Sequence, residues 1–152
     1  MAQLGHRVFF DTSVYVAALL SDEGAANELI CLAEDNAIRM VVSEEVIVEI
    51  DRVLSRKFPD LVHRSRELLK RLSPEIAPTP PRVQLKRLLH KLDDGDASIL
   101  CSAHLAKVSA FVTWNTRDFM AHGVDALVDC PIVVPADALK LFRKWIEPFL
   151  DG

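Results

Sequence analysis

Residues 7–14 read RVFFDTSV, and this segment begins a pattern that the rest of the chain repeats. After the arginine comes an apolar run that suits a short buried strand, and Asp11 follows it directly. Further apolar runs stand at 39–42 (RMVV), 110–114 (AFVTW) and 131–134 (PIVV). Apolar strands that alternate with helices indicate a parallel sheet covered on both faces. We therefore predict an α/β fold, a three-layer sandwich with about four to five parallel strands flanked by helices.

Helical spacing of apolar residues predicts the connecting elements. The predicted helices cover residues 13–20, 24–36, 43–57, 60–72, 83–92, 96–106 and 135–146. Ser43 is the expected N-cap of the third helix, and the last helix is expected to end before Pro148. The proline-rich segment 73–81 is expected to be a loop or an edge segment.

Length and composition predict one globular domain over residues 1–152, with its core at about 6–147. Half of the residues are hydrophobic and 26% are charged, which excludes a disordered or fibrous chain. The apolar run 14–20 is too short to cross a bilayer, and the N-terminus lacks a signal-peptide pattern, so we expect a cytoplasmic protein without membrane attachment. The three cysteines form no CxxC pair, which argues against a zinc site or a disulfide framework, and we expect reduced thiols in the core.

Four acids are candidates for a common site. Asp11 follows the first strand and Asp118 follows the 110–114 strand after a short turn, while Glu49 lies at the border of the apolar stripe of its helix and Asp96 shares the phase of the apolar residues of its own. Three of these acids also have a structural interpretation. Asp11 and Asp96 could be helix N-caps, and Asp118 could be a turn residue.

Convergence of these acids would require compensation of their charge. Two carboxylates about 4 Å apart repel by about 4 kcal/mol at an effective dielectric constant of 20, so four of them need bound cations or protons. Oxygen ligands favour hard ions, and Mg²⁺ or Mn²⁺ suits the number of carboxylates better than Ca²⁺ does.

Four segments, in this order, resemble the successive motifs of PIN-domain nucleases, including the VapC-like toxin ribonucleases. They are FFDTSV (9–14), VSEEVIVEI (42–50), DASILCSA (96–103) and FVTWNTRDF (111–119). Residues 134–139 are similar to the closing strand and helix of the family, so the resemblance covers nearly the whole chain.

The resemblance implies an endoribonuclease that hydrolyses phosphodiester bonds with one or two Mg²⁺ or Mn²⁺ ions. It places the catalytic and metal-binding carboxylates at Asp11, Glu49, Asp96 and Asp118, and supporting polar groups at Thr12, Ser13, Thr113 and Asn115. Some members carry an acid at the position of Asn115, whereas others have asparagine there with the acid three residues later, as in this chain. Asp93 and Asp94 precede the same helix as Asp96, and phase with the apolar residues favours Asp96 as the ligand.

The charge distribution is compatible with RNA binding. Residues 52–91 contain eleven lysines and arginines against three acids, although the whole chain has a net charge of −4. We predict that single-stranded or looped RNA is the substrate, with its backbone held by charge. The candidate RNA contacts are Arg52, Arg56, Lys57 and Arg117. Trp114, beside the presumed site, is expected either to stack on a base or to pack in the core or at the rim.

The resemblance also implies partners. The expected protein is the toxin of a type II toxin–antitoxin pair, with a cognate antitoxin. The alternatives are a housekeeping RNA-processing nuclease and a catalytically silent PIN fold that binds RNA or protein. An apolar, mainly aromatic stripe runs along the last helix and consists of Leu141, Phe142, Trp145 and Phe149. It predicts a homodimer through this helix, unless the stripe is wholly buried in the core.

Overall fold

The computed structural model describes residues 5–150, and its centre is a five-stranded sheet. The strands are β1 (Arg7–Phe10), β2 (Arg39–Val42), β3 (Glu75–Ile76), β4 (Ala110–Val112) and β5 (Ile132–Val133). All neighbouring strands pair in parallel, in the order β3-β2-β1-β4-β5. The predicted fold class is therefore confirmed, and the proline-rich segment contributes the edge strand β3.

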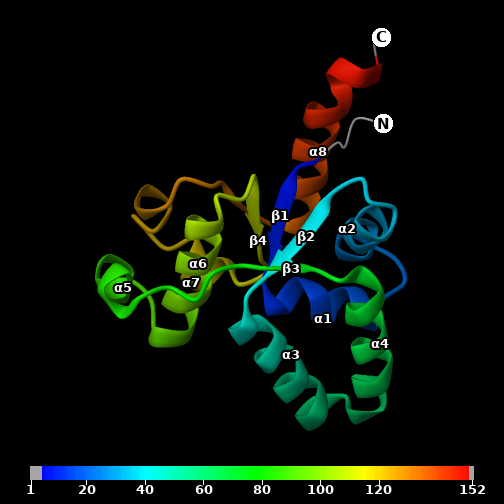
Figure 1. Cartoon of the computed structure of the whole chain (residues 1–152), viewed down its shortest axis with the longest axis horizontal. Helices are drawn as coiled ribbons and strands as arrows, with labels where there is room; N and C mark the ends of the chain where they lie inside the picture. Colours follow the sequence, from blue (N-terminus) through cyan, green and yellow to red (C-terminus); the bar gives the residue numbers. More distant parts are fainter. Residues whose placement is uncertain (1–4, 151–152) are drawn as a thin grey trace.

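Helices connect consecutive strands. They are α1 (Thr12–Leu20), α2 (Ala25–Glu34), α3 (Glu44–Lys57), α4 (Val62–Leu72), α5 (Arg82–Leu89), α6 (Asp94–Ala106), α7 (Thr116–Phe119) and α8 (Pro135–Leu150), with 3₁₀ turns η1 (Pro59–Leu61) and η2 (Asp125–Leu127). In Figure 1, α2 and α4 lie to one side of the strands and α5, α6 and α7 lie to the other. Ser43 caps α3 as predicted, because its Oγ accepts a hydrogen bond from the amide of Val46 at 3.3 Å.

Several helices differ in extent from the sequence prediction: α5 ends at Leu89 and not at residue 92, α6 begins at Asp94 and not at Asp96, and the largest difference is at the end of α8. Helix α8 continues through Pro148 to Leu150. Proline removes one backbone donor, and the carbonyl that loses its partner belongs to the solvent-exposed Lys144, where water can replace the bond. The four-residue helix α7 stands where only a turn was expected, and its N-cap is Asn115.

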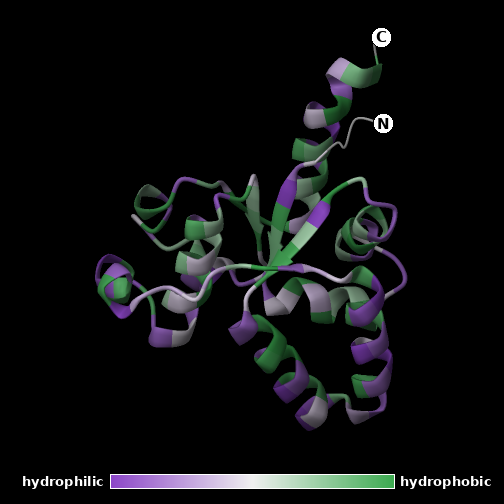
Figure 2. Cartoon of the chain, viewed as in Figure 1, coloured by the Kyte–Doolittle hydropathy of each residue, from purple (hydrophilic) through white to green (hydrophobic). Residues whose placement is uncertain are grey.

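The core consists of the strands and the inner faces of the helices. Phe9, Phe10 and Phe111 are fully buried. Phe9 stacks on Phe111 at a centroid distance of 5.3 Å, and Phe119 of α7 packs against Phe111 at 4.9 Å. Figure 2 shows hydrophobic strands at the centre and hydrophilic residues on the outer helices. Of the expected core cysteines, Cys101 and Cys130 are buried, but the prediction for Cys31 was wrong, because its position on α2 is exposed.

The topology creates a switch point at one end of the sheet. The chain leaves β1 towards β2 on one side, while β4 flanks β1 on the other, so the strand order reverses between β1 and β4. In parallel sheets, ligands bind beyond the carboxyl ends of the strands at such a point. Asp11 and Thr113 are the residues that follow β1 and β4 there.

No helix in the described part of the chain is both long enough and apolar enough to span a membrane.

Candidate active site

Asp11 lies at the switch point, directly after β1, and is 5% exposed. Its backbone amide donates to the carbonyl of Val112 at 3.0 Å, which extends the pairing of β1 and β4 by one residue. Its Oδ2 accepts hydrogen bonds from Ser13 Oγ at 3.0 Å and from Thr113 Oγ1 at 2.8 Å. Asp11 stands at the N-cap position of α1 but makes no capping hydrogen bond with its side chain. The capping interpretation is therefore wrong for this carboxylate, which is held by two hydroxyl groups instead.

Asp118 is positioned by the short helix α7. Asn115 Oδ1 accepts from the amide of Asp118 at 3.3 Å, and Asn115 Nδ2 donates to Asp118 Oδ2 at 3.1 Å. The amide of Asn115 in turn donates to Thr113 Oγ1 at 2.9 Å, and the buried ring of Phe119 anchors the helix in the core. A continuous chain of hydrogen bonds thus leads from Asp118 through Asn115 and Thr113 to Asp11.

Glu49 approaches Asp11 from α3. It lies between Val46 and Ile50, which are buried, and is itself partly buried. Burial raises its pKa, and the nearby charge of Asp11 raises it further. The hydroxyl of Thr12 lies near Glu49 and opposes these shifts. Within residues 5–150, however, the buried Thr12 Oγ1 makes no hydrogen bond of regular geometry.

Asp96 is the third residue of α6. The N-cap of this helix is Asp93, whose Oδ1 accepts from the amide of Asp96 at 2.8 Å, so the capping interpretation of Asp96 is also wrong. Burial raises the pKa of Asp96 to about 7, and the charges of Asp93, Asp11, Asp118 and Glu49 contribute in that order. Asp94 is exposed.

The carboxylates therefore form one electrostatically coupled group. Burial also raises the pKa of Asp11, although its two hydroxyl donors oppose the shift. Asp118 differs, because the hydrogen bond from Asn115 lowers its pKa, with smaller contributions from Arg117 and Asp96. Asp118 is thus stabilised as an anion. The raised pKa values of the other three carboxyls mean that they do not all ionise easily at once unless a cation is present.

The chemistry of these donors fits a hard divalent ion. In the described part of the chain, no three acidic, histidine or cysteine side chains are arranged to hold an ion by themselves. Mg²⁺ is commonly held by only one or two carboxylates and completes its shell with water. The unpartnered Thr12 Oγ1 beside Glu49 is a polar group that such water would satisfy.

The basic residues of 52–91 do not form a single surface. Helices α4 and α5, which carry most of them, lie on opposite sides of the strands (Figure 1). Arg66 pairs with Asp51 at 2.9 Å, and Arg71 approaches Glu34 at 3.6 Å. Two of the predicted RNA contacts adjoin the acids, because Arg52 lowers the pKa of Glu49 and Arg117 Nε lies 3.4 Å from Asp118 Oδ1. The other two, Arg56 and Lys57, lie in the last turn of α3, about 10 Å along the helix from Glu49.

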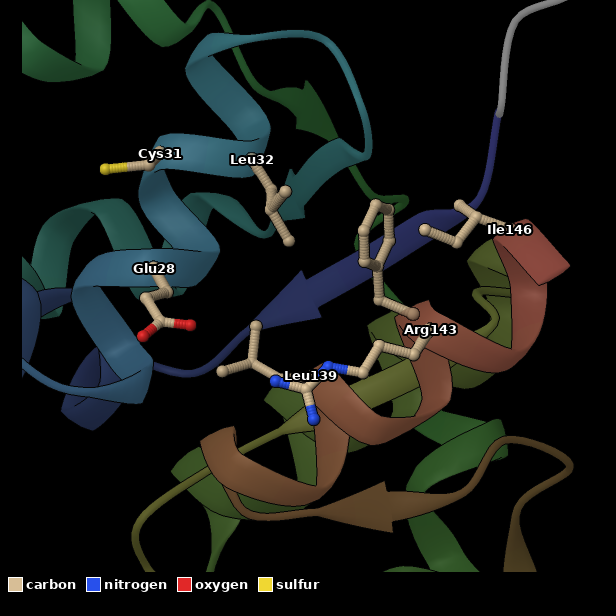
Figure 3. A pocket seen from close by; sticks show the side chains of 7 residues that line it. Glu28, Cys31, Leu32, Leu139, Arg143 and Ile146 are labelled. Atoms are coloured by element: carbon tan, nitrogen blue, oxygen red, sulfur yellow. The ribbon is translucent and has the colours of Figure 1, made fainter. Parts of the chain in front are cut away.

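A separate groove of about 440 Å³ lies between α2 and α8. Its walls are mainly apolar, and Figure 3 shows Leu32 facing Leu139 across it, with Glu28 on α2 and Arg143 on α8. One acid and one base on opposite walls do not supply hydrolytic chemistry. The acids at the strand ends are therefore the better candidate active site, although this groove is more hollowed.

Comparison with known proteins now identifies the architecture. The sequence profile described as "PIN domain" matches residues 7–117, from the start of β1 into α7. The chain belongs to the PIN-domain family. This family consists of nucleases, and the match confirms the resemblance seen in the four motifs. A comparison with curated protein sequences found no match.

A solved structure shares the fold of this PIN domain. It is described as VapBC2 from Rickettsia felis bound to a DNA fragment from their promoter, and it superimposes with a TM-score of 0.60. Sequence identity is 18%, and the alignment covers 84% of this chain and 98% of the other. The identity is low, so the likeness concerns the fold.

The sequence interpretation missed the role of Asp93, although the signal for it was present. Asp93 and Asp96 stand at the N-cap and third positions of α6, as Asn115 and Asp118 do in α7. Asparagine or aspartate followed three residues later by an acid is typical of a helix start. The repeated spacing places both Asp96 and Asp118 in the first turn of a helix, where the helix dipole favours negative charge.

Proposed function

We propose that this PIN domain is a divalent-metal-dependent endoribonuclease that hydrolyses phosphodiester bonds in single-stranded or looped RNA. The observation that carries the proposal is the grouping of Asp11, Glu49, Asp96 and Asp118 at the strand switch point, where burial, followed by the charges of Asp93 and of the other three acids, raises the pKa of Asp96 to about 7. Such a group is costly in a folded protein unless it serves to bind cations.

Different residues of the chain would bind the metal ions, position the ligands and contact the RNA. Asp11 and Asp96 would be the principal ligands, Asp118 and Glu49 would complete the site, and one or two Mg²⁺ or Mn²⁺ ions would be held. A bound ion supplies a Lewis acid that polarises the phosphate and lowers the pKa of water. Ser13 and Thr113 fix the Asp11 carboxylate, and Asn115 fixes that of Asp118. Arg52 and Arg117 would contact the RNA backbone beside the acids.

The first prediction is strict dependence on a divalent ion. We expect the purified protein to cleave single-stranded RNA in Mg²⁺ or Mn²⁺ and to lose this activity in EDTA, because four carboxylates repel a phosphate unless a cation lies between them. Gel analysis of labelled RNA measures this. Cleavage that continues in excess chelator would exclude the proposed mechanism, and absence of cleavage with both metals and several RNAs would favour the silent, RNA- or protein-binding alternative.

We further propose that the nuclease is the toxin of a type II toxin–antitoxin pair and works in the cytoplasm. The likeness to a chain of VapBC2, a complex solved with promoter DNA, supports this assignment over housekeeping RNA processing. A small adjacent gene that encodes a DNA-binding protein, whose product suppresses RNA cleavage when mixed with this chain, would be the expected antitoxin. Housekeeping processing would be favoured by the lack of such a gene.

A homodimer through α8 is the remaining proposal about partners. Phe142 packs against the core and Trp145 stacks on His6 at 4.3 Å, but Phe149 is 57% exposed and Leu150 is 70% exposed. Figure 1 shows this end of α8 projecting beyond the rest of the molecule. Burial of this exposed apolar surface is a reason for the chain to self-associate.

The second prediction tests the dimer. Light scattering at micromolar concentration is expected to give twice the 17.0 kDa mass of the chain, and Phe149→Glu is expected to give the monomer mass. Trp145→Ala should also weaken the dimer, but it removes the stack on His6 as well, so Phe149→Glu is the cleaner variant. A 17.0 kDa particle for the unmodified chain would exclude the dimer at that concentration.

A further inference from the structure

Trp114 is an exposed aromatic side chain at the carboxyl end of β4. It directly follows Thr113, which is fully buried, yet 48% of its own surface is exposed. Among the phenylalanine, tyrosine and tryptophan side chains of residues 5–150, only Trp114 and Phe149 are exposed, and Phe149 lies on the projecting end of α8. The interpretation of Trp114 as a core residue is therefore wrong, because nearly half of its surface is accessible.

The backbone of Trp114 is fixed relative to Asp11. Its amide donates to Ser13 Oγ at 3.0 Å, and the same hydroxyl donates to Asp11 Oδ2 at 3.0 Å. Its carbonyl accepts from the amide of Thr116 at 3.0 Å. The side chain of Ser13 thus links the main chain of Trp114 to the carboxylate of Asp11. These hydrogen bonds constrain the backbone at this exposed residue.

We propose that Trp114 forms a nucleobase subsite, in which the indole stacks on an unpaired base of the RNA next to the bond that is cleaved. This inference rests on the proposed ribonuclease function and adds the chemical group that is recognised. A base has a π-face whatever its identity, so stacking holds single-stranded RNA without strict sequence preference. Bases in a duplex are already stacked and unavailable, which accounts for selection of single-stranded or looped substrate. The side chain of Arg117, three residues further on, is 90% exposed and lies against Asp118, from where it would contact the adjoining phosphate.

The other tryptophan provides an internal control. Trp145 stacks on His6, which precedes β1 and therefore lies at the amino end of the parallel strands, opposite to Trp114. The chain has two tryptophans, so Trp145→Phe leaves Trp114 as the only one. The ring of phenylalanine preserves an aromatic contact with His6 in that variant.

The test measures RNA binding without cleavage. In an Asp96→Asn background with Mg²⁺, which keeps the RNA intact, a single-stranded oligoribonucleotide is expected to quench the emission of Trp114 in the Trp145→Phe variant. An abasic oligonucleotide of the same length and charge should leave the emission unchanged. By fluorescence anisotropy, Trp114→Ala should bind the RNA about tenfold more weakly, Trp114→Phe should retain most of the affinity, and Phe149→Ala should bind normally.

The outcomes separate the subsite from the nuclease. Unchanged affinity in Trp114→Ala, or equal quenching by the abasic oligonucleotide, would overturn the subsite even if the unmodified protein cleaves RNA. Base-dependent quenching in a protein that cleaves no RNA would retain the subsite and overturn the nuclease. A chain that neither binds nor cleaves single-stranded RNA would overturn both.

Discussion

Asp96→Asn is expected to lower the rate of RNA cleavage by about 1,000-fold in saturating Mg²⁺, equivalent to about 4 kcal/mol of transition-state stabilisation. Asparagine has the shape of aspartate but lacks the charge that binds a divalent ion. Asp96 is where the charges of Asp11, Asp118 and Glu49 act together, so its loss should weaken the whole site. Single-turnover cleavage of a labelled oligoribonucleotide measures the effect.

Asp94→Asn is the matched control for this variant. Asp94 lies two residues earlier on the same helix and is exposed, so its replacement removes the same charge from the first turn of α6 without removing a member of the coupled group. We expect it to cleave RNA at nearly the normal rate. Equal losses in the two variants would mean that general charge at the helix start matters, and that Asp96 holds no ion.

Asp11→Asn should cause a loss of similar size for a related reason. Both hydroxyl donors, Ser13 and Thr113, bind the same oxygen, Oδ2. An asparagine can place its own oxygen in that position and keep both hydrogen bonds, so the variant removes charge while the local geometry is retained. A circular-dichroism melt that matches the unmodified chain, combined with absent cleavage, is the expected pair of results.

The sequence predicts the fold well because the strands are almost entirely apolar and the amphipathic helices have a clear periodicity. The runs at β1, β2 and β4 are nearly all buried, and each is bordered by a polar residue or a helix start. The short elements were harder to predict. Strand β3 has two residues among prolines and pairs with β2 alone, so it was expected only as a loop or an edge segment. Helix α7 is a single turn that depends on Asn115 and on the burial of Phe119.

The phase of the helices predicts that Asp96 and Glu49 lie near the inner faces of their helices, and both are partly buried. It does not predict which residues they contact. Periodicity gives the direction of a side chain, whereas hydrogen bonds such as Thr113 to Asp11 join residues a hundred positions apart. In the basic segment 52–91, by contrast, residues that are close in sequence lie apart in the structure. Its charges are neighbours in sequence, but β3 passes along the sheet edge between α4 and α5, and the two helices occupy opposite sides of the strands.

Without metal, Asp96→Asn is expected to be more stable than the unmodified chain at pH 8, to keep less than half of this advantage at pH 5, and to lose it near pH 3. The pKa of Asp96 is about 7 in the folded chain against 3.8 as the ordinary value, so the folded state binds more protons between these pH values. The free energy of unfolding therefore falls as pH rises through this range, and the loss is complete above pH 7. Asparagine does not titrate and escapes this loss.

The size of the effect follows from the same pKa values. They set an upper bound of about 4 kcal/mol, and solvent screening of the partly exposed carboxyl reduces this to about 2 kcal/mol, or about 5 °C in melting temperature. Comparison of the two chains at each pH cancels groups with lowered pKa values, such as Glu75 and Asp51, whose contributions to stability are instead lost in acid.

Added Mg²⁺ should reverse the order of stability at pH 8. An ion that binds only the folded state stabilises it by mass action, and it binds the ionised Asp96 of the unmodified chain more tightly than the amide. Thermal melts at pH 5 and pH 8, with EDTA or with Mg²⁺, therefore give four comparisons with defined signs. If Asp96→Asn instead melts several degrees lower at both pH values in EDTA, the carboxylate is a structural element of α6. Removal of a repelling charge would raise the melting temperature, so a lower value means that the substitution removes a stabilising contact.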